Sequence, residues 1–319
     1  MTMNWKTIAI AICLVLIALY PPAHGSRYIL HVMIMFFIWA SICTLWDLMA
    51  GYAGILSLAN VGFVMIGAYL SGIFSKTFGV PPAVAILVGA ALTMLAVTVV
   101  LALPALRMTG IYIALLTIVF ADTLPSFISM TSKYTGGAIG LREVPLLWEG
   151  MTRTGAYYAL FCVFLAISVI TWKIIRSRTG LAFQALRDDE ELANSLGVNI
   201  FKEKLKVFAV CSFLTGLMGG FYVHYLGVVS PGTNSLDSFM LALCMIFLGG
   251  LGRFPGPIMG AFFLTVVNQL LQLAGTWRPF MIGVLICTLI MFLPGGFMQI
   301  VDWIDQKRKP PQKVLPKAG

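Results

Sequence analysis

The sequence has few charged side chains. Only 10% of its 319 residues are charged, whereas 60% are hydrophobic, and the mean hydropathy is +0.95. Soluble domains carry about 25% charged residues. A soluble fold of this length would leave too much apolar surface facing water, so the composition excludes an ordinary soluble protein. It predicts an all-α integral membrane protein.

Common nucleotide-binding and catalytic motifs are also missing. The chain has no GxxxxGK[ST] loop, no HExxH pair and no GxSxG turn. Its three histidines, at positions 24, 31 and 224, lie far apart in sequence and are better explained as packing or interface residues than as metal ligands. An intramembrane enzyme would need Asp, His or Ser clustered at one interface, and no such cluster stands out. We therefore expect no catalytic residue and no metal site.

What the sequence does contain is a succession of long apolar runs. The first, 5–20, is open to interpretation as a signal peptide, but we favour a membrane helix because no convincing cleavage site follows. Together the apolar runs predict a single transmembrane domain over 1–298, which leaves a basic tail over 299–319. About ten segments are expected: 5–20, 28–46, 55–74, 81–103, 110–130, 155–175, 205–226, 239–250, 255–274 and 279–293.

Positive charge orients these segments. The net charge is +9, and ten crossings with a cytoplasmic N-terminus place most of the 21 lysines and arginines on the cytoplasmic face. We therefore interpret the positive charge as an orientation signal and expect a lipid bilayer, not a nucleic acid, as its partner. Both termini are then cytoplasmic. The first five and last five segments would enter the membrane from opposite sides, the relation typical of an inverted repeat.

The loop 177–206 is the longest polar interval, and it becomes cytoplasmic in this orientation. It predicts a short helix over 189–196, with Asp188 as N-cap, Glu191 in capping-box position and Gly197 as the stop. About two turns of helix are too short to be stable alone. The helix therefore needs a partner for its apolar stripe, which consists of Leu192, Ala193 and Leu196.

Glycines interrupt two of the apolar regions and predict broken helices. Non-helical backbone at membrane depth offers free polar groups to a substrate, although close helix packing through small residues is the alternative. The glycines concerned are Gly51, Gly54, Gly249, Gly250 and Gly252. The candidate substrate-pathway residues are Ser57, Asn60, Asp122 and Asn268, among which Asp122 has the alternative of a polar residue near the outer interface.

Several of these stretches resemble one family. They are GYAGILSLANVGFVMIGAY (51–69), TGGAIGL (135–141), SRTGLAFQALRDDEELANSLGVN (177–199), GGLGRFPGPIMGA (249–261) and LPGG (293–296). In these segments the chain is similar to the LivM-type permeases of branched-chain amino acid ABC importers. The family often has Gln where Ile55 stands and Gly-His where Ala59 and Asn60 stand, so urea or a short amide is an alternative substrate.

This resemblance implies a bacterial inner-membrane permease without enzymatic activity. Its partners would be a second homologous permease, two ATP-binding subunits that hold the ATP and Mg, and a periplasmic substrate-binding protein. The short helix would be a coupling helix that drives alternating access when the ATP-binding subunits close. An ion-coupled secondary transporter, which needs no ATPase, is the competing class. The coupling residues would be Asp188, Asp189, Glu190, Glu191, Leu192, Ala193, Leu196 and Gly197.

Overall fold

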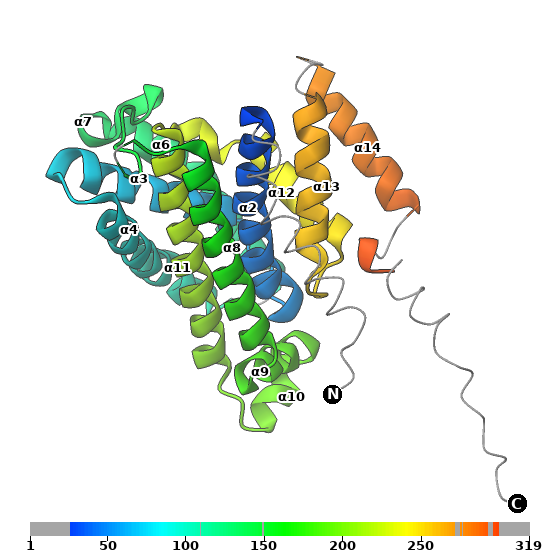
Figure 1. The fold of residues 1–319 in the computed structure, drawn as a ribbon. Coiled ribbons are helices and arrows are strands. Elements are labelled where there is room, and N and C mark those ends of the chain that lie inside the picture. The colour runs from blue at the N-terminus through cyan, green and yellow to red at the C-terminus, as the bar shows by residue number, and fades with distance from the viewer. Residues whose placement is uncertain are drawn as a thin grey trace, which may run out of the picture.

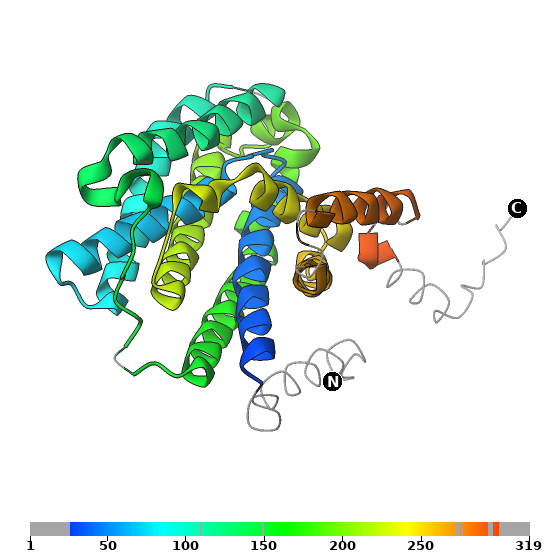
Figure 2. The same ribbon diagram turned by 90° about the horizontal axis from the view of Figure 1, so that it is seen from above.

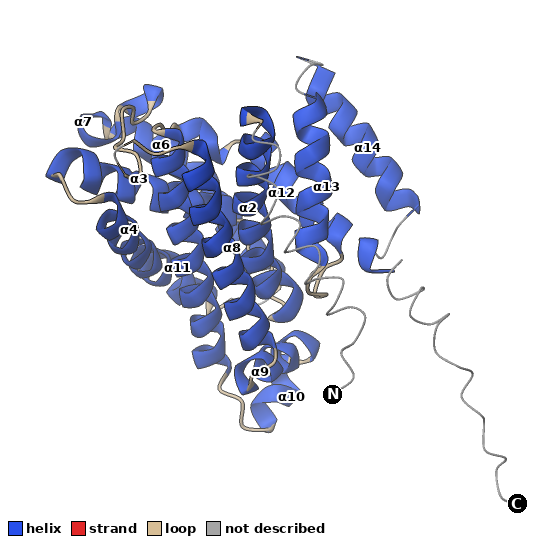
Figure 3. Ribbon diagram, viewed as in Figure 1, coloured by secondary structure: helices blue, strands red, loops and turns tan. Residues whose placement is uncertain are grey.

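The computed structural model describes residues 26–108, 110–148, 150–271, 275, 277–292 and 296–299 (Figure 1). The first expected segment, 5–20, lies outside the described residues, as does all of the tail beyond residue 299. The described part is helical apart from turns and one isolated bridge, between Leu141 and Val229 (Figure 3). The all-α prediction is therefore confirmed for this part of the chain.

The helices follow one another with short connections. They are α2 (Arg27–Asp47), the π-helix η1 (Leu48–Tyr52), α3 (Asn60–Phe78), α4 (Pro82–Val97), the π-helix η2 (Thr98–Ala102), α5 (Leu103–Ala105), α6 (Ile111–Met130), α7 (Ser132–Thr135), the 3-10 helix η3 (Gly137–Ile139), α8 (Arg153–Ile175), α9 (Arg178–Asp188), α10 (Glu190–Ser195), α11 (Ile200–Leu226), the 3-10 helix η4 (Pro231–Asn234), α12 (Leu236–Gly249), α13 (Gly256–Leu270) and α14 (Arg278–Phe292).

Length and composition make six of the described helical stretches candidate membrane spans. The helices α12, α13 and α14, which cover the last three expected segments, have only 14, 15 and 15 residues. A full crossing takes about 20 residues, so the expected count of about ten spans is not confirmed. The six candidates are Arg27–Tyr52, Asn60–Phe78, Pro82–Ala105, Ile111–Met130, Arg153–Ile175 and Ile200–Leu226.

The central packing unit joins α11 to α3 and α4, and α2 packs against α8 and α13. Seen from above, α2 lies between the group formed by α3, α4 and α11 and the pair formed by α13 and α14 (Figure 2). Glycines let the helices approach: a Cβ added at Gly67 of α3 would lie 2.5 Å from the Cα of Gly216 in α11. Such small-residue contacts are the usual way for membrane helices to pack closely.

The third apolar segment differs from its predicted bounds. We expected a helix over 55–74, but residues 53–59 run without helical structure and α3 begins at Asn60. The Thr117 hydroxyl of α6 accepts a hydrogen bond from the Leu58 N–H at 2.9 Å, which satisfies a donor that a helix would have paired internally. The break that the glycines predicted is therefore present, but it lies ahead of α3 and shortens it.

Candidate functional site

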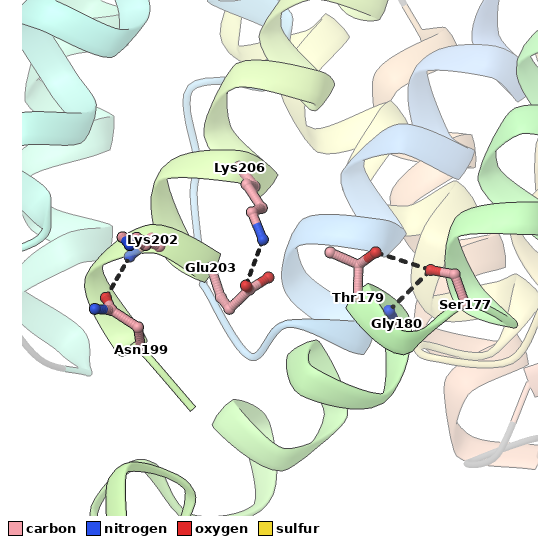
Figure 4. Close-up of polar contacts among 7 residues, drawn as sticks. All are labelled: Ser177, Thr179, Gly180, Asn199, Lys202, Glu203 and Lys206. Carbon is pink, nitrogen blue, oxygen red and sulfur yellow. Dashed lines mark hydrogen bonds and ion pairs between the residues drawn. The ribbon is translucent and has the colours of Figure 1, made fainter. Parts of the chain in front are cut away.

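The segment 177–199 forms a helical pair, α9 and α10, at the end of the molecule where α8 finishes and α11 starts (Figure 1). The Ser177 Oγ caps α9 by accepting from the Gly180 N–H at 3.4 Å and also pairs with Thr179 Oγ1 at 2.9 Å. Asn199 Oδ1 caps α11 by accepting from the Lys202 N–H at 2.9 Å (Figure 4). Side-chain caps therefore hold both ends of this segment.

The short helix begins one residue later than predicted. Asp189, not Asp188, is the N-cap, and its Oδ1 accepts from the N–H groups of Glu191 at 2.9 Å and Leu192 at 3.0 Å. Asp188 is instead the last residue of α9, a helix that the sequence analysis missed. Because the cap has moved, Glu191 is the second residue of α10 and cannot complete the expected capping box. The expected stop at Gly197 is present, with φ +86°.

The predicted apolar stripe divides between two environments. Ala193 is buried, with 2% of its surface exposed, and faces the protein. Leu192 and Leu196 are 58% and 76% exposed. The inward contact that holds α10 in place is thus made by Ala193, which leaves the two leucines as an apolar pair on the outer surface of the segment.

An ion pair fixes α10 to the start of α11. Lys204 Nζ lies 2.6 Å from Glu190 Oε1, and the lysine side chain is only 3% exposed. Two residues further along α11, Lys206 Nζ lies 2.5 Å from Glu203 Oε1 (Figure 4). A buried ammonium without its carboxylate is costly, so the Glu190–Lys204 pair constrains where α10 can sit.

Arg187 connects α9 to the first helix break. Its Nη1 donates to the Gly51 carbonyl at 3.0 Å, and its guanidinium also pairs with Asp188 Oδ1. Gly54, two residues beyond η1, passes so close to α9 that an added Cβ would lie 2.9 Å from the Arg187 Cα. The backbone at the end of α2 is therefore in direct contact with the helical pair.

The helix break after α2 also contacts the second helix break, which follows α12. Asp47 Oδ1 accepts from the Gly252 N–H at 2.6 Å, and the Tyr52 hydroxyl accepts from the Phe254 N–H at 2.9 Å. A Cβ at Gly51 would lie 2.7 Å from the Gly252 Cα, inside any normal contact. We call Asp47, Gly51, Arg187 and Gly252 the junction. Asp47 was not among the predicted site residues, although an acidic residue closing an apolar segment before a glycine-rich turn was a usable signal.

The other predicted break glycines serve the same close packing. A Cβ at Gly249 would lie 2.8 Å from the Pro257 nitrogen of α13. Gly250 adopts φ +104° as its N–H bonds to the Ile246 carbonyl at 3.0 Å, a conformation that side-chain-bearing residues rarely adopt. At these positions the glycines allow close packing of backbone on backbone, and their role toward a substrate stays a prediction.

The four candidate pathway residues lie in different settings. Ser57 is buried, and its Oγ accepts from the Ala59 N–H at 3.4 Å. Asn60 is 1% exposed, and neither its Nδ2 nor its Oδ1 has a hydrogen-bond partner among the described residues. Asp122 is exposed on α6. The Asn268 amide oxygen accepts from Arg278 at 2.9 and 2.6 Å, so that residue already has a structural partner.

In the part of the chain that the structure describes, side chains that could bind a metal ion do not lie together at the helical pair, at the junction or around the four candidate pathway residues. Within the described residues, no three His, Cys, Asp or Glu side chains lie where they could hold a metal ion. What the site offers is a mechanical arrangement: an exposed apolar pair on α10, an anchored helical pair, and a junction that joins it to both helix breaks.

Comparison with known proteins agrees with the sequence resemblance. The permease protein LivM of the high-affinity branched-chain amino acid transport system, from Salmonella typhimurium and from Escherichia coli, is in each case 26% identical over 280 residues, covering 79% of this chain. The autoinducer 2 import permease LsrC of Photorhabdus laumondii is 28% identical over 154 residues, covering 46% of this chain and 45% of LsrC. No solved structure matches the chain.

This chain covers 65% of the length of the two LivM proteins. The family model described as "Branched-chain amino acid transport system / permease component" matches residues 28–293, a range that includes the helical pair and both helix breaks. The chain therefore belongs to the permease family of branched-chain amino acid transport systems.

Proposed function

We propose that this chain is the membrane-spanning permease subunit of an ABC importer and that its substrate is an aliphatic, branched-chain amino acid. Membership of the permease family supports this assignment, as does the similarity to the two LivM proteins, which belong to branched-chain amino acid transport systems. Members of that family move solutes and do not transform them, so the chain is not an enzyme. The structural observation that carries the proposal is the anchored helical pair with Leu192 and Leu196 exposed.

The proposed location is the bacterial inner membrane, with both termini and the helical pair in the cytoplasm. The excess of lysine and arginine on that side supports this orientation. We retain about ten membrane segments related by an inverted repeat as part of the proposal. The short helices α12 and α13, separated by the break at 250–255, are of the half-crossing kind that such repeats contain.

The proposed partners are a second homologous permease, two ATP-binding subunits and a periplasmic substrate-binding protein. ATP and Mg would be bound by the ATP-binding subunits, leaving no cofactor in this chain. Leu192 and Leu196 would fill an apolar groove on an ATP-binding subunit. The acidic residues Asp188 and Glu191 beside them would meet basic groups there.

A movement of the ATP-binding subunits would then be transmitted to the membrane helices through the junction. Arg187 holds the Gly51 carbonyl, and Gly51 packs on Gly252, whose N–H bonds to Asp47. A displacement of α9 therefore acts on the end of α2 and the end of α12 together. That is the connection required if closure of ATP-binding subunits is to change which side of the membrane a substrate can reach.

The test is leucine uptake by proteoliposomes that contain the chain with its permease partner, ATP-binding subunits and binding protein. Leu196→Asp should abolish uptake and release the ATP-binding subunits while leaving membrane insertion intact, since a 76% exposed side chain contributes little to the fold. Leu146→Asp is the matched control, because Leu146 is also exposed but lies in the segment before α8, away from α10.

Three outcomes would contradict the proposal. Normal uptake by Leu196→Asp would exclude the coupling role of α10. Uptake by the chain alone, driven by an ion gradient, would establish a secondary transporter. Uptake of urea or a short amide in place of leucine would show that the substrate is not an amino acid. That is the alternative raised by Ile55 and Asn60 in the third segment.

A further inference from the structure

A cavity of about 220 Å³ lies between α2, α3, α11, α12 and η4. One wall is apolar and is formed by Ile38 and Ile42 of α2 with Val61 and Val64 of α3. A cavity of about 150 Å³ is enough to hold benzene. The space is therefore adequate for a small aliphatic molecule, and its four branched side chains match the shape of another branched aliphatic group.

The rest of the lining, apart from Trp39 and Gly232, is polar but uncharged. It carries hydroxyl groups from Tyr222 of α11, from Ser230 and Thr233 at η4, and from Ser238 of α12. Two of these are already connected to neighbours: Ser238 Oγ lies 3.0 Å from Ser235 Oγ, and Tyr222 shares a side-chain hydrogen bond with Thr233. An apolar wall facing a few convergent polar groups is the usual composition of a small-molecule site.

The cavity also receives the N-terminal ends of two helices. Val61 is the second residue of α3, which begins at Asn60, and Ser238 is the third residue of α12, which begins at Leu236. First-turn N–H groups have no acceptor within their own helix, and they favour an anionic group such as a carboxylate. In α12 the Ser238 N–H already donates to the Ser235 Oγ at 3.3 Å and Asp237 lies in the first turn, whereas no side chain caps α3. The start of α3 is therefore the end that can receive the anion. The site can thus compensate a carboxylate without a basic side chain in its wall.

An unpaired polar side chain stands at the start of α3, one residue before the lining residue Val61. Asn60, adjacent in sequence to Val61, is 1% exposed, and both side-chain polar atoms lack a partner among the described residues. A buried amide left unpaired costs roughly 1–3 kcal/mol. Asn60 does not itself line the cavity, so its unpaired amide marks an unsatisfied polar group at the start of α3 and not a contact inside the cavity.

The position in the membrane fits a transported molecule. Ile38 is the twelfth residue of α2, so it lies roughly 17 Å along that helix at 1.5 Å per residue, about half of a 30 Å hydrocarbon core. From this level α3 runs toward Lys76, which bonds to the Arg142 carbonyl, and α12 runs the other way to the junction at Gly252. Sites at mid-membrane between broken helices are typical of transporters.

From these observations we infer that the cavity is a substrate-binding site for an aliphatic α-amino acid. Its side chain packs on Ile38, Ile42 and Val64. Its carboxylate faces the uncapped first turn of α3, and its ammonium group is held by hydroxyl oxygens of the polar lining. The inference rests on the proposed function, because it assigns a place in this chain to the solute that the importer carries.

The test measures protection of a cysteine by substrate in the complete reconstituted complex. Thr233→Cys is treated with a small water-soluble thiol reagent, with and without the leucine-loaded binding protein. Labelling of the parent chain is subtracted, since its Cys162 and Cys287 are exposed. At ten times the Kd, leucine should slow modification about tenfold, in proportion to the unoccupied fraction. Ser132→Cys is the control and should not be protected, because Ser132 is exposed on α7, which does not line the cavity.

A second variant tests the apolar wall independently. Val64→Ala enlarges the cavity, so it should raise the uptake of leucine relative to valine by about tenfold, the lower range for one methylene in an apolar pocket. Val84→Ala, on the exposed side of α4, is the matched control and should leave this ratio unchanged.

The outcomes separate this inference from the function on which it rests. If the wild-type complex imports leucine but Thr233→Cys is unprotected and Val64→Ala keeps the parental ratio, the cavity is not the substrate site. Protection by urea and not by leucine also overturns the inference. If the wild-type complex imports no aliphatic amino acid at all, the proposed function itself is wrong.

Discussion

Substitution of Gly51 by alanine is the most direct perturbation of the junction. The added Cβ would lie 2.7 Å from the Gly252 Cα and closer still to the Gly252 nitrogen, which are both backbone atoms, and it would also meet the Asp47 carboxylate. The two backbone segments must therefore separate. Overpacking of this kind costs about 1–3 kcal/mol. Separation also stretches the 2.6 Å bond from the Gly252 N–H to Asp47.

The expected result is a less stable and poorly coupled permease. Each kcal/mol lowers Tm by about 2–4 °C in chains of 150–250 residues, so Gly51→Ala should lower the Tm of the purified protein by several degrees. ATP-driven leucine uptake should fall further than the amount of folded protein does, because the path from α9 to α12 passes through this contact. The measurements are Tm in detergent and uptake per ATP hydrolysed in proteoliposomes.

Gly283→Ala is the matched control. Gly283 lies in α14 with no heavy atom within 4 Å of an added Cβ, and alanine is the better helix former by about 1 kcal/mol. It should leave Tm and uptake unchanged or slightly raised. If Gly51→Ala behaved in the same way as this control, close packing of the two breaks would have no part in stability or coupling.

Two further predictions concern the polar contacts between helices. Glu190→Gln should leave the buried Lys204 ammonium unpaired and speed proteolysis within 189–199, whereas adding Lys204→Met should restore resistance; equal cleavage of both variants would contradict this. His224→Ala should lower Tm more than Ser71→Ala, since the imidazole bonds to Ser71 Oγ at 2.9 Å and to the Pro145 carbonyl at 2.6 Å and each lost bond costs roughly 1–3 kcal/mol; the opposite order would refute it.

Local patterns were enough to identify several features of the helical pair. Gly197 ends α10 as expected because an αL position after a helix favours glycine wherever the helix is placed. The capping residue was placed wrongly by one position. Asp188 and Asp189 are adjacent and chemically equal, and only the extension of α9 through Asp188 decides which of them caps the next helix.

The sequence alone determined that this is a membrane protein with an all-α fold, where its long polar loop lies and which family it resembles. Each of these depends on composition or on residues close together in the chain. Only the tertiary structure decided that Gly51 packs on Gly252, that Glu190 meets Lys204, and that Ile38 and Thr233 line one cavity. The physical reason is that these contacts are set by how whole helices cross, and no local pattern in the chain records the spacing between them.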